Sequence, residues 1–231
     1  MLLKIMSYIP LRYTIVNVSL VCKHFNVLVK SGVLWQSFGS LTDFGCISYD
    51  KKTLDNIFQH SHHFKRLYFN GNFKKLLSEV SMGYIYQSLS ACFNLVVLDL
   101  TTNFCISDLS FLAHMPKLRE LSIEWCINIE PESATDILST KTICTQMKKL
   151  NMRRCEQFNS SDIILIANAH KNLEELNIFN IDFYSVKYAL KIVEMLPRLS
   201  TFFLSPDLVA DSVQEWANLQ DKIPSLVYDF I

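Results

Sequence analysis

The sequence lacks the features that define several classes of protein. It has only five glycines among 231 residues, no net charge at pH 7, and no long apolar run free of polar side chains. The longest uncharged stretch, residues 80–98, is interrupted by serine, glutamine and asparagine. A dedicated nucleic-acid-binding protein needs an excess of lysine and arginine, and a transmembrane helix needs about 20 predominantly apolar residues. The sequence therefore predicts neither a nucleic-acid partner nor a membrane span.

Motifs of common enzymes and metal sites are also missing. There is no phosphate-binding glycine loop, no H-E-x-x-H, no G-x-S-x-G and no calcium-loop pattern. The seven cysteines contain no C-x-x-C pair, and the cluster of His60, His62 and His63 has no nearby acidic or cysteine partner, so we expect it in a solvated linker. The odd cysteine count and the absence of a signal peptide favour a reducing compartment. We expect a non-enzymatic protein of the cytoplasm or nucleus, without metal or cofactor.

The sequence does contain a repeat. The pattern L-x-x-L-x-L, with other apolar residues allowed, occurs six times at starts 23 to 31 residues apart, and a weaker final copy begins at Leu226. The copies start at Phe64, Leu95, Leu118, Met147, Leu173 and Leu199. Alternate residues of an extended chain point to the same side, so each copy predicts a short parallel strand buried on one face. Segments with helical periodicity separate the copies, for example around Val186 and Ile163 after a Ser160 cap.

Asparagine or cysteine follows several copies at one fixed position, three residues beyond the last apolar residue. These residues are Asn72, Asn103, Cys126 and Cys155. The pattern resembles the cysteine-containing class of leucine-rich repeats, whose period is roughly 20 to 29 residues. The resemblance implies an α/β fold, a curved right-handed solenoid over residues 64–231 with a parallel sheet on its concave face. We expect these four side chains to bind backbone groups at the turn after each strand, rather than metal.

The concave face is the predicted binding surface. Side chains between and after the apolar positions point outward and form columns across adjacent strands. We expect target-binding residues among Glu124, Trp125, Arg153, Arg154, Phe179 and Phe203, because exposed aromatics beside arginine are common anchors of protein interfaces. The arginines favour an acidic or phosphorylated target. In one alternative the arginines pair with Glu124 and leave no site; in another, Phe203 packs against a C-terminal cap.

The first forty residues predict two short amphipathic helices. One apolar stripe ends at Pro10, and a second runs from Ile15 to Val29. The segments KIMSYIPLR (residues 4–12) and VCKHF (21–25), followed by Leu28 and then Leu34-Trp35, resemble an F-box. On this basis we expect an F-box at residues 1–40, with a truncated first helix because the family's opening Leu-Pro-x-Glu is absent, and a helical linker at residues 41–63.

An F-box followed by leucine-rich repeats resembles the substrate receptors of Skp, cullin and F-box ubiquitin ligases. The resemblance implies a Skp-type adaptor as partner, cullin through that adaptor, and a target protein on the repeats. It makes Ile5, Ile9, Pro10 and Trp35 candidate adaptor contacts. Residues 1–94 carry ten basic and four acidic side chains, which suits an acidic adaptor surface. The alternative is a leucine-rich-repeat scaffold without a ligase, whose N-terminal helices only cap the solenoid.

Overall fold

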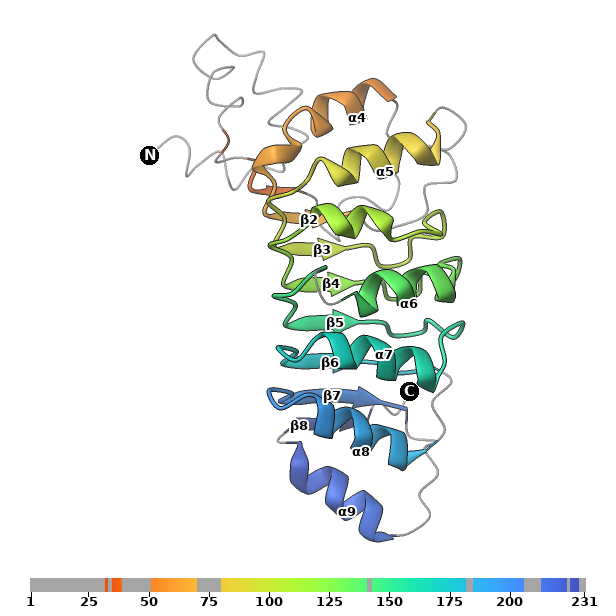
Figure 1. Cartoon of the computed structure of the whole chain (residues 1–231). Helices are drawn as coiled ribbons and strands as arrows, with labels where there is room; N and C mark the ends of the chain where they lie inside the picture. The colour runs from red at the N-terminus through yellow and green to blue at the C-terminus, as the bar shows by residue number, and fades with distance from the viewer. Residues whose placement is uncertain are drawn as a thin grey trace.

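The computed structural model describes residues 32, 35–38, 51–69, 80–140, 143–181, 185–205, 213–223 and 225–228. In these residues eight parallel strands form one open sheet, in which spatial order follows sequence order (Figure 1). The strands are β1 (Ser37–Phe38), β2 (Arg66–Tyr68), β3 (Val97–Asp99), β4 (Glu120–Ser122), β5 (Lys149–Asn151), β6 (Glu175–Asn177), β7 (Thr201–Leu204) and β8 (Ser225–Tyr228). The chain forms the leucine-rich-repeat solenoid that the sequence predicts.

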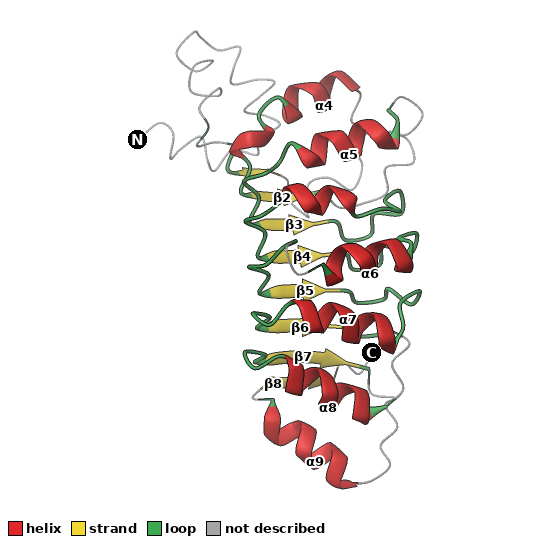
Figure 2. Ribbon diagram, in the orientation of Figure 1, coloured by secondary structure: helices red, strands yellow, loops and turns green. Residues whose placement is uncertain are grey.

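Helices connect successive strands and pack along one side of the sheet (Figure 2). The α-helices are α4 (Lys51–Phe58), α5 (Met82–Ser90), α6 (Pro131–Ser139), α7 (Ser160–Ala169), α8 (Val186–Met195) and α9 (Val213–Lys222); η2 (Ser61–His63) and η4 (Ser110–His114) are 3-10 helices. One hydrophobic core between the sheet and the helices runs from Trp35 to Ile223. None of these helices is long and apolar enough to cross a membrane.

The strand register confirms the predicted repeat. Leu98, Leu121, Leu150 and Leu176 lie opposite one another on β3 to β6, and all four are buried. The middle leucine of each copy therefore faces the core, and the residues on either side face the open surface of the sheet. This register places the outward columns as the spacing predicts.

The sheet begins earlier than residue 64. On β1, Phe38 pairs with Leu67, so Trp35 takes the position that Phe64 has in the next repeat. Helix α4 follows β1 as the other helices follow their strands. The linker expected at residues 41–63 is helical in its described part, but it belongs to an additional first repeat. The L-x-x-L-x-L pattern missed this repeat because its third position in the sequence, residue 40, is a serine and not an apolar residue.

Two details at other positions differ from the sequence expectations. Leu226 pairs with Phe202, the middle residue of its copy, so the final copy begins at Ile223 and not at Leu226. Helix α7 is capped by Asn159 rather than Ser160, and Asp162 completes a capping box with it. An asparagine side chain and an acidic residue three positions later satisfy two free N–H groups at once, which a Ser160 cap would not do.

Candidate functional site

The turns at the carboxyl ends of the strands carry most of the predicted target-binding residues. At these turns a side-chain oxygen of the strand's last residue accepts a hydrogen bond from the N–H group two residues later. Asp99 Oδ1 binds the Thr101 amide at 2.9 Å, and Asn151 and Asn177 bind those of Arg153 and Phe179 at 3.1 Å. This outward column therefore shapes the turns, and the side chains that follow it are placed by local geometry.

The next residue of each turn has a left-handed backbone, although none of these residues is glycine. The φ angles are 59° at Thr102, 57° at Trp125, 58° at Arg154 and 56° at Asn180. This conformation costs an L-residue roughly 1–2 kcal/mol, and it is rare for a bulky side chain. The Trp125 amide donates to Arg153 O at 2.8 Å, and the amides of Thr102 and Arg154 make equivalent backbone bonds to the next repeat. The Asn180 amide donates instead to Ser205 Oγ at 2.7 Å. The solenoid thus keeps a tryptophan in a strained and fixed position.

Trp125 and Arg154 form the exposed part of the site. The Arg154 guanidinium lies over the Trp125 ring, 5.1 Å from its centroid, and Phe104 meets the same ring edge-on at 6.3 Å. Trp125 is 43% exposed and Ile127 is 49% exposed. We call Phe104, Trp125, Ile127 and Arg154 the Trp125 ledge. Rigid aromatic surface beside a stacked cation is the composition of interface anchors.

Phe104 and Ile127 are not among the binding residues predicted from the sequence. Each follows directly after a position of the asparagine and cysteine column, Asn103 or Cys126, whose side chains are fully buried. Because the asparagine or cysteine side chain points into the core, the side chain of the next residue points away from the core, at the same position in each of these two repeats. An apolar residue directly after the asparagine or cysteine was therefore the sequence signal for these two residues. The predicted outward columns ended before this position.

Arg153, Glu124 and Phe179 are brought together, but not as an open patch. Arg153 lies 3.9 Å from Glu124 Oε1 and 5.0 Å from the Phe179 ring centroid, and Asn151 donates to Glu124 Oε2 at 3.0 Å. Phe179 is only 5% exposed, so the expectation of an exposed Phe179 is wrong. Arginine stacks on its ring and covers it. The alternative in which Glu124 pairs with arginine holds for Arg153 but not for Arg154, which stacks on Trp125.

Phe203 lies apart from these residues. It is on β7, half-buried between Asn177 of β6 and Val227 of β8. Because β5 and β6 separate β7 from β4, Phe203 does not join the Trp125 ledge. Its pairing with β8 corresponds to the alternative of packing near the C-terminal end.

The remaining charges of the outward columns partly neutralise one another. Lys149 pairs with Glu175 at 2.9 Å, and beside them Lys148 pairs with Glu174 at 2.6 Å. The hydrogen bond to Glu175 raises the pKa of Lys149, and the hydrogen bond from Lys148 lowers the pKa of Glu174. Both pairs are solvent-exposed, and such pairs contribute little to stability. They leave β5 and β6 without a strong charge of either sign.

The asparagine and cysteine column has the structural role that the sequence predicts. Cys126 Sγ donates to Leu100 O at 3.0 Å, Cys155 Sγ donates to Ile123 O at 3.1 Å, and Asn103 donates to Phe69 O at 3.2 Å. Burial raises the pKa of both thiols to about 12, which opposes thiolate chemistry. In the described part of the chain no cluster of histidine, cysteine or acidic residues could hold a metal. Asn72 lies outside the described residues.

Trp35 is the candidate adaptor contact that the structure describes. It is 1% exposed, and its ring stacks on His60 at 4.0 Å and on Phe64 at 6.2 Å between centroids. Trp35 therefore fills the end of the core and is not an open contact surface, contrary to our expectation. The same stacking places His60 against the first repeat rather than in a solvated linker. Ile5, Ile9 and Pro10 lie outside the described residues.

Comparison with known proteins agrees with this architecture. A family model described as F-box-like matches residues 1–39. An internalin from Listeria monocytogenes has a similar structure, with a TM-score of 0.50 and 18% sequence identity over 85% of this chain and 59% of that chain. The leucine-rich-repeat protein LegL7 from Legionella pneumophila gives a TM-score of 0.47 and 18% identity over 73% of this chain and 59% of that one. No curated protein matches the sequence significantly.

At this identity the likeness to the internalin shows the fold alone, and this chain spans 59% of that protein's length. The F-box-like match covers the N-terminal residues 1–39, and the repeat sheet contains the described strands from β1 onward. F-box and leucine-rich-repeat regions both act by binding other proteins. The protein consists of an F-box-like region followed by a leucine-rich-repeat solenoid, and its parts are protein-interaction modules.

Proposed function

We propose that this protein is the substrate-recognition subunit of a Skp, cullin and F-box ubiquitin ligase. The observation that carries the proposal is the F-box-like match at residues 1–39 directly ahead of a repeat solenoid. In this role residues 1–39 bind a Skp-type adaptor, which connects the chain to cullin, and the repeats hold a target protein for ubiquitination. The chain itself is non-catalytic. It acts in the cytoplasm or nucleus.

The Trp125 ledge is the proposed anchor for the target. The turns after β4 and β5 present both apolar surface and positive charge. The apolar surface comes from exposed Trp125 and Ile127, and the charge comes from Arg154. Burial of a large aromatic ring in a complex is a major source of binding energy. The backbone carbonyl of Arg153 accepts a hydrogen bond from the Trp125 amide and so helps to fix the position of Trp125.

The alternative is a scaffold without a ligase, and the burial of Trp35 favours it. In that case the N-terminal segment covers the end of the core, as solenoids require. The two functions differ in whether a Skp-type adaptor binds. Ile9→Asp with Pro10→Ala should abolish co-purification with the adaptor, while Trp125→Ala should leave it intact. Failure of the unmodified protein to bind adaptor would contradict the ligase function and leave the scaffold as the remaining candidate.

A further inference from the structure

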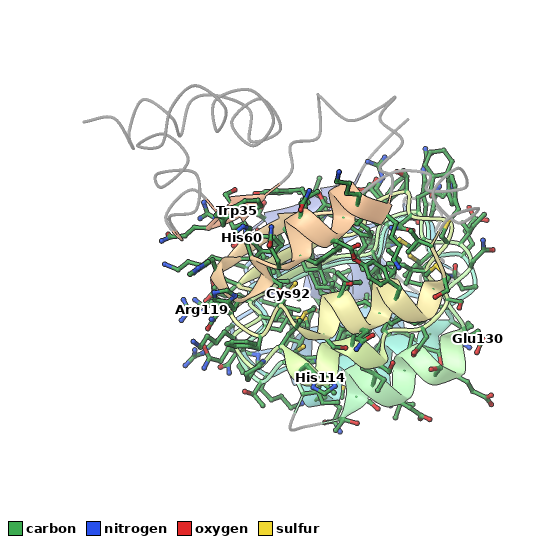
Figure 3. The ribbon with its side chains drawn as sticks, turned by 90° about the horizontal axis from the view of Figure 1, so that it is seen from above. Trp35, His60, Cys92, His114, Arg119 and Glu130 are labelled. Atoms are coloured by element: carbon green, nitrogen blue, oxygen red, sulfur yellow. The ribbon has the colours of Figure 1, made fainter. Side chains whose placement is uncertain are left out.

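A hollow of about 460 Å³ opens beside the amino ends of β2 and β3, away from the Trp125 ledge. Its side chains come from η2 and from the turns before β1 to β4: Gln36, His62, His63, Lys65, Asn94 and Lys117. Figure 3 shows Trp35, His60 and Arg119 on this side of the solenoid, opposite Glu130. Its volume is within the 300–1,000 Å³ typical of ligand sites.

The two lysines of the hollow are held by neutral partners. Lys65 Nζ donates to Gln36 Oε1 at 3.2 Å, and Lys117 Nζ donates to Asn94 Oδ1 at 2.6 Å. Asn94 is itself fixed, because its amide nitrogen donates to His62 O at 2.7 Å. No carboxylate is among the described residues that line the hollow. Within the described part of the chain, these two positive charges are therefore held by amides and by no carboxylate.

Other lysines on the same edge of the sheet show the contrast. Lys148 and Lys149, further along the solenoid, each have a glutamate within 2.9 Å. Among the described residues, this edge therefore has lysines paired with glutamate at β5 and lysines paired with amides before β2 and β4. An uncompensated pair at a hollow is the arrangement expected for an anion site.

The histidines add hydrogen-bonding groups. The His62 and His63 rings lie 3.9 Å apart, and a Cβ on Gly32 would come within 2.5 Å of the His63 ring. Gly32 therefore allows this ring to lie where it does. Burial and the neighbouring His62 lower the pKa of His63. At neutral pH the lysines supply the charge, and an imidazole N–H supplies a neutral donor.

We propose that this hollow binds the phosphate group of a phosphorylated side chain on a protein held by the repeats. A phosphomonoester carries a charge of about −1.5 to −2 and three acceptor oxygens, which matches two ammonium groups and adjacent N–H donors. A carboxylate would leave one lysine uncompensated. The hollow is also larger than a phosphate ion and has room for the residue that carries it. The inference rests on the proposed target-binding role of the repeats.

The test uses the full chain and a fluorescent peptide pool with a central phosphoserine and randomised flanks. Fluorescence anisotropy should show at least ten-fold tighter binding than for the same pool with serine. Lys65→Glu with Lys117→Glu should remove this difference. The matched control is Lys171→Glu with Lys187→Glu, which makes the same change of charge outside the hollow; the Lys171 ammonium is likewise held by an amide oxygen, that of Asn168 at 3.1 Å. Unchanged thermal melting of both double variants shows that the fold is intact.

Equal binding of the two pools, or phosphoserine binding that survives in the Lys65 and Lys117 variant, would overturn the proposal. If inorganic phosphate competes at the concentration of the peptide, the hollow binds a small anion. If a single-stranded oligonucleotide competes equally well, the hollow binds polyanions in general. Either result would also overturn the proposal. Adaptor capture and the Trp125 variants are measured separately. A failed hollow is therefore distinguishable from a failed ligase role.

Discussion

Cys155 donates a hydrogen bond from its Sγ atom to the carbonyl oxygen of Ile123, 3.1 Å away in the preceding repeat. Cys126 makes the same bond to Leu100, and Asn103 makes it to Phe69 through its amide. A thiol and a carboxamide can occupy the same position here because both place a donor on a buried carbonyl after the strand ends. Each of these three side chains links its repeat to the one before it.

Replacing Cys126 with Ala should lower the free energy of unfolding by about 0.5–1.5 kcal/mol, because the buried Leu100 carbonyl loses the thiol donor and keeps only its hydrogen bond from the Asn103 amide. Urea denaturation measures the change. Cys126→Ser keeps a donor and should cost less than the alanine variant. If the alanine and serine variants were equally stable, the hydrogen bond would not be the reason for the column.

Leu150→Ala should cost about 2–5 kcal/mol, because the side chain is 1% exposed in the core between neighbouring strands. The measurement is the midpoint of urea unfolding together with its slope. Leu165→Ala provides the control, since Leu165 is 52% exposed on α7 and surface changes of this kind stay within about 0.5 kcal/mol. Similar costs for the two variants would contradict the observed register.

Trp125→Gly separates binding from stability. Glycine relieves a left-handed strain of roughly 1–2 kcal/mol. Its flexible unfolded state costs about 0.5–1 kcal/mol, and loss of the Phe104 and Arg154 contacts costs about 1–2.5 kcal/mol, so stability should fall by no more than about 2.5 kcal/mol. Capture of target proteins, measured by proximity labelling, should fall sharply. Asn180→Gly changes an equivalent turn and should leave the captured proteins unchanged. The same protein set in both variants would place target binding elsewhere.

His170 should make the fold sensitive to acid. Its ring is buried, with Nε2 at 2.7 Å from the Leu138 carbonyl oxygen, and burial lowers its pKa. The unfolded state therefore binds the proton more readily, so stability is full above about pH 6.5 and falls below it, by at most about 1.4 kcal/mol per pH unit. Urea unfolding between pH 7 and 5 measures the slope. His170→Gln should flatten it and exposed His114→Gln should not; an unchanged slope in His170→Gln would remove this explanation.

The repeat and its strand register were determined by the sequence alone. Leucine at fixed spacing dictates which face of each strand is buried, and the asparagine and cysteine position dictates where the strand ends; Leu121, Leu150 and Cys126 lie where the pattern predicts. These features depend on neighbours within one repeat and on its copy in the next. Local spacing is sufficient for them.

Only the tertiary structure decided which outward side chains remain open. Phe179 and Trp125 follow their strands at nearly the same place, yet Arg153 covers Phe179 while Arg154 leaves Trp125 exposed. Trp35 matches an F-box pattern in sequence, but the pairing of Phe38 with Leu67 places Trp35 at the first apolar position of the additional first repeat, where it is buried. Packing between side chains on different repeats sets these outcomes, because a long arginine or an aromatic ring reaches partners that spacing along one strand does not specify.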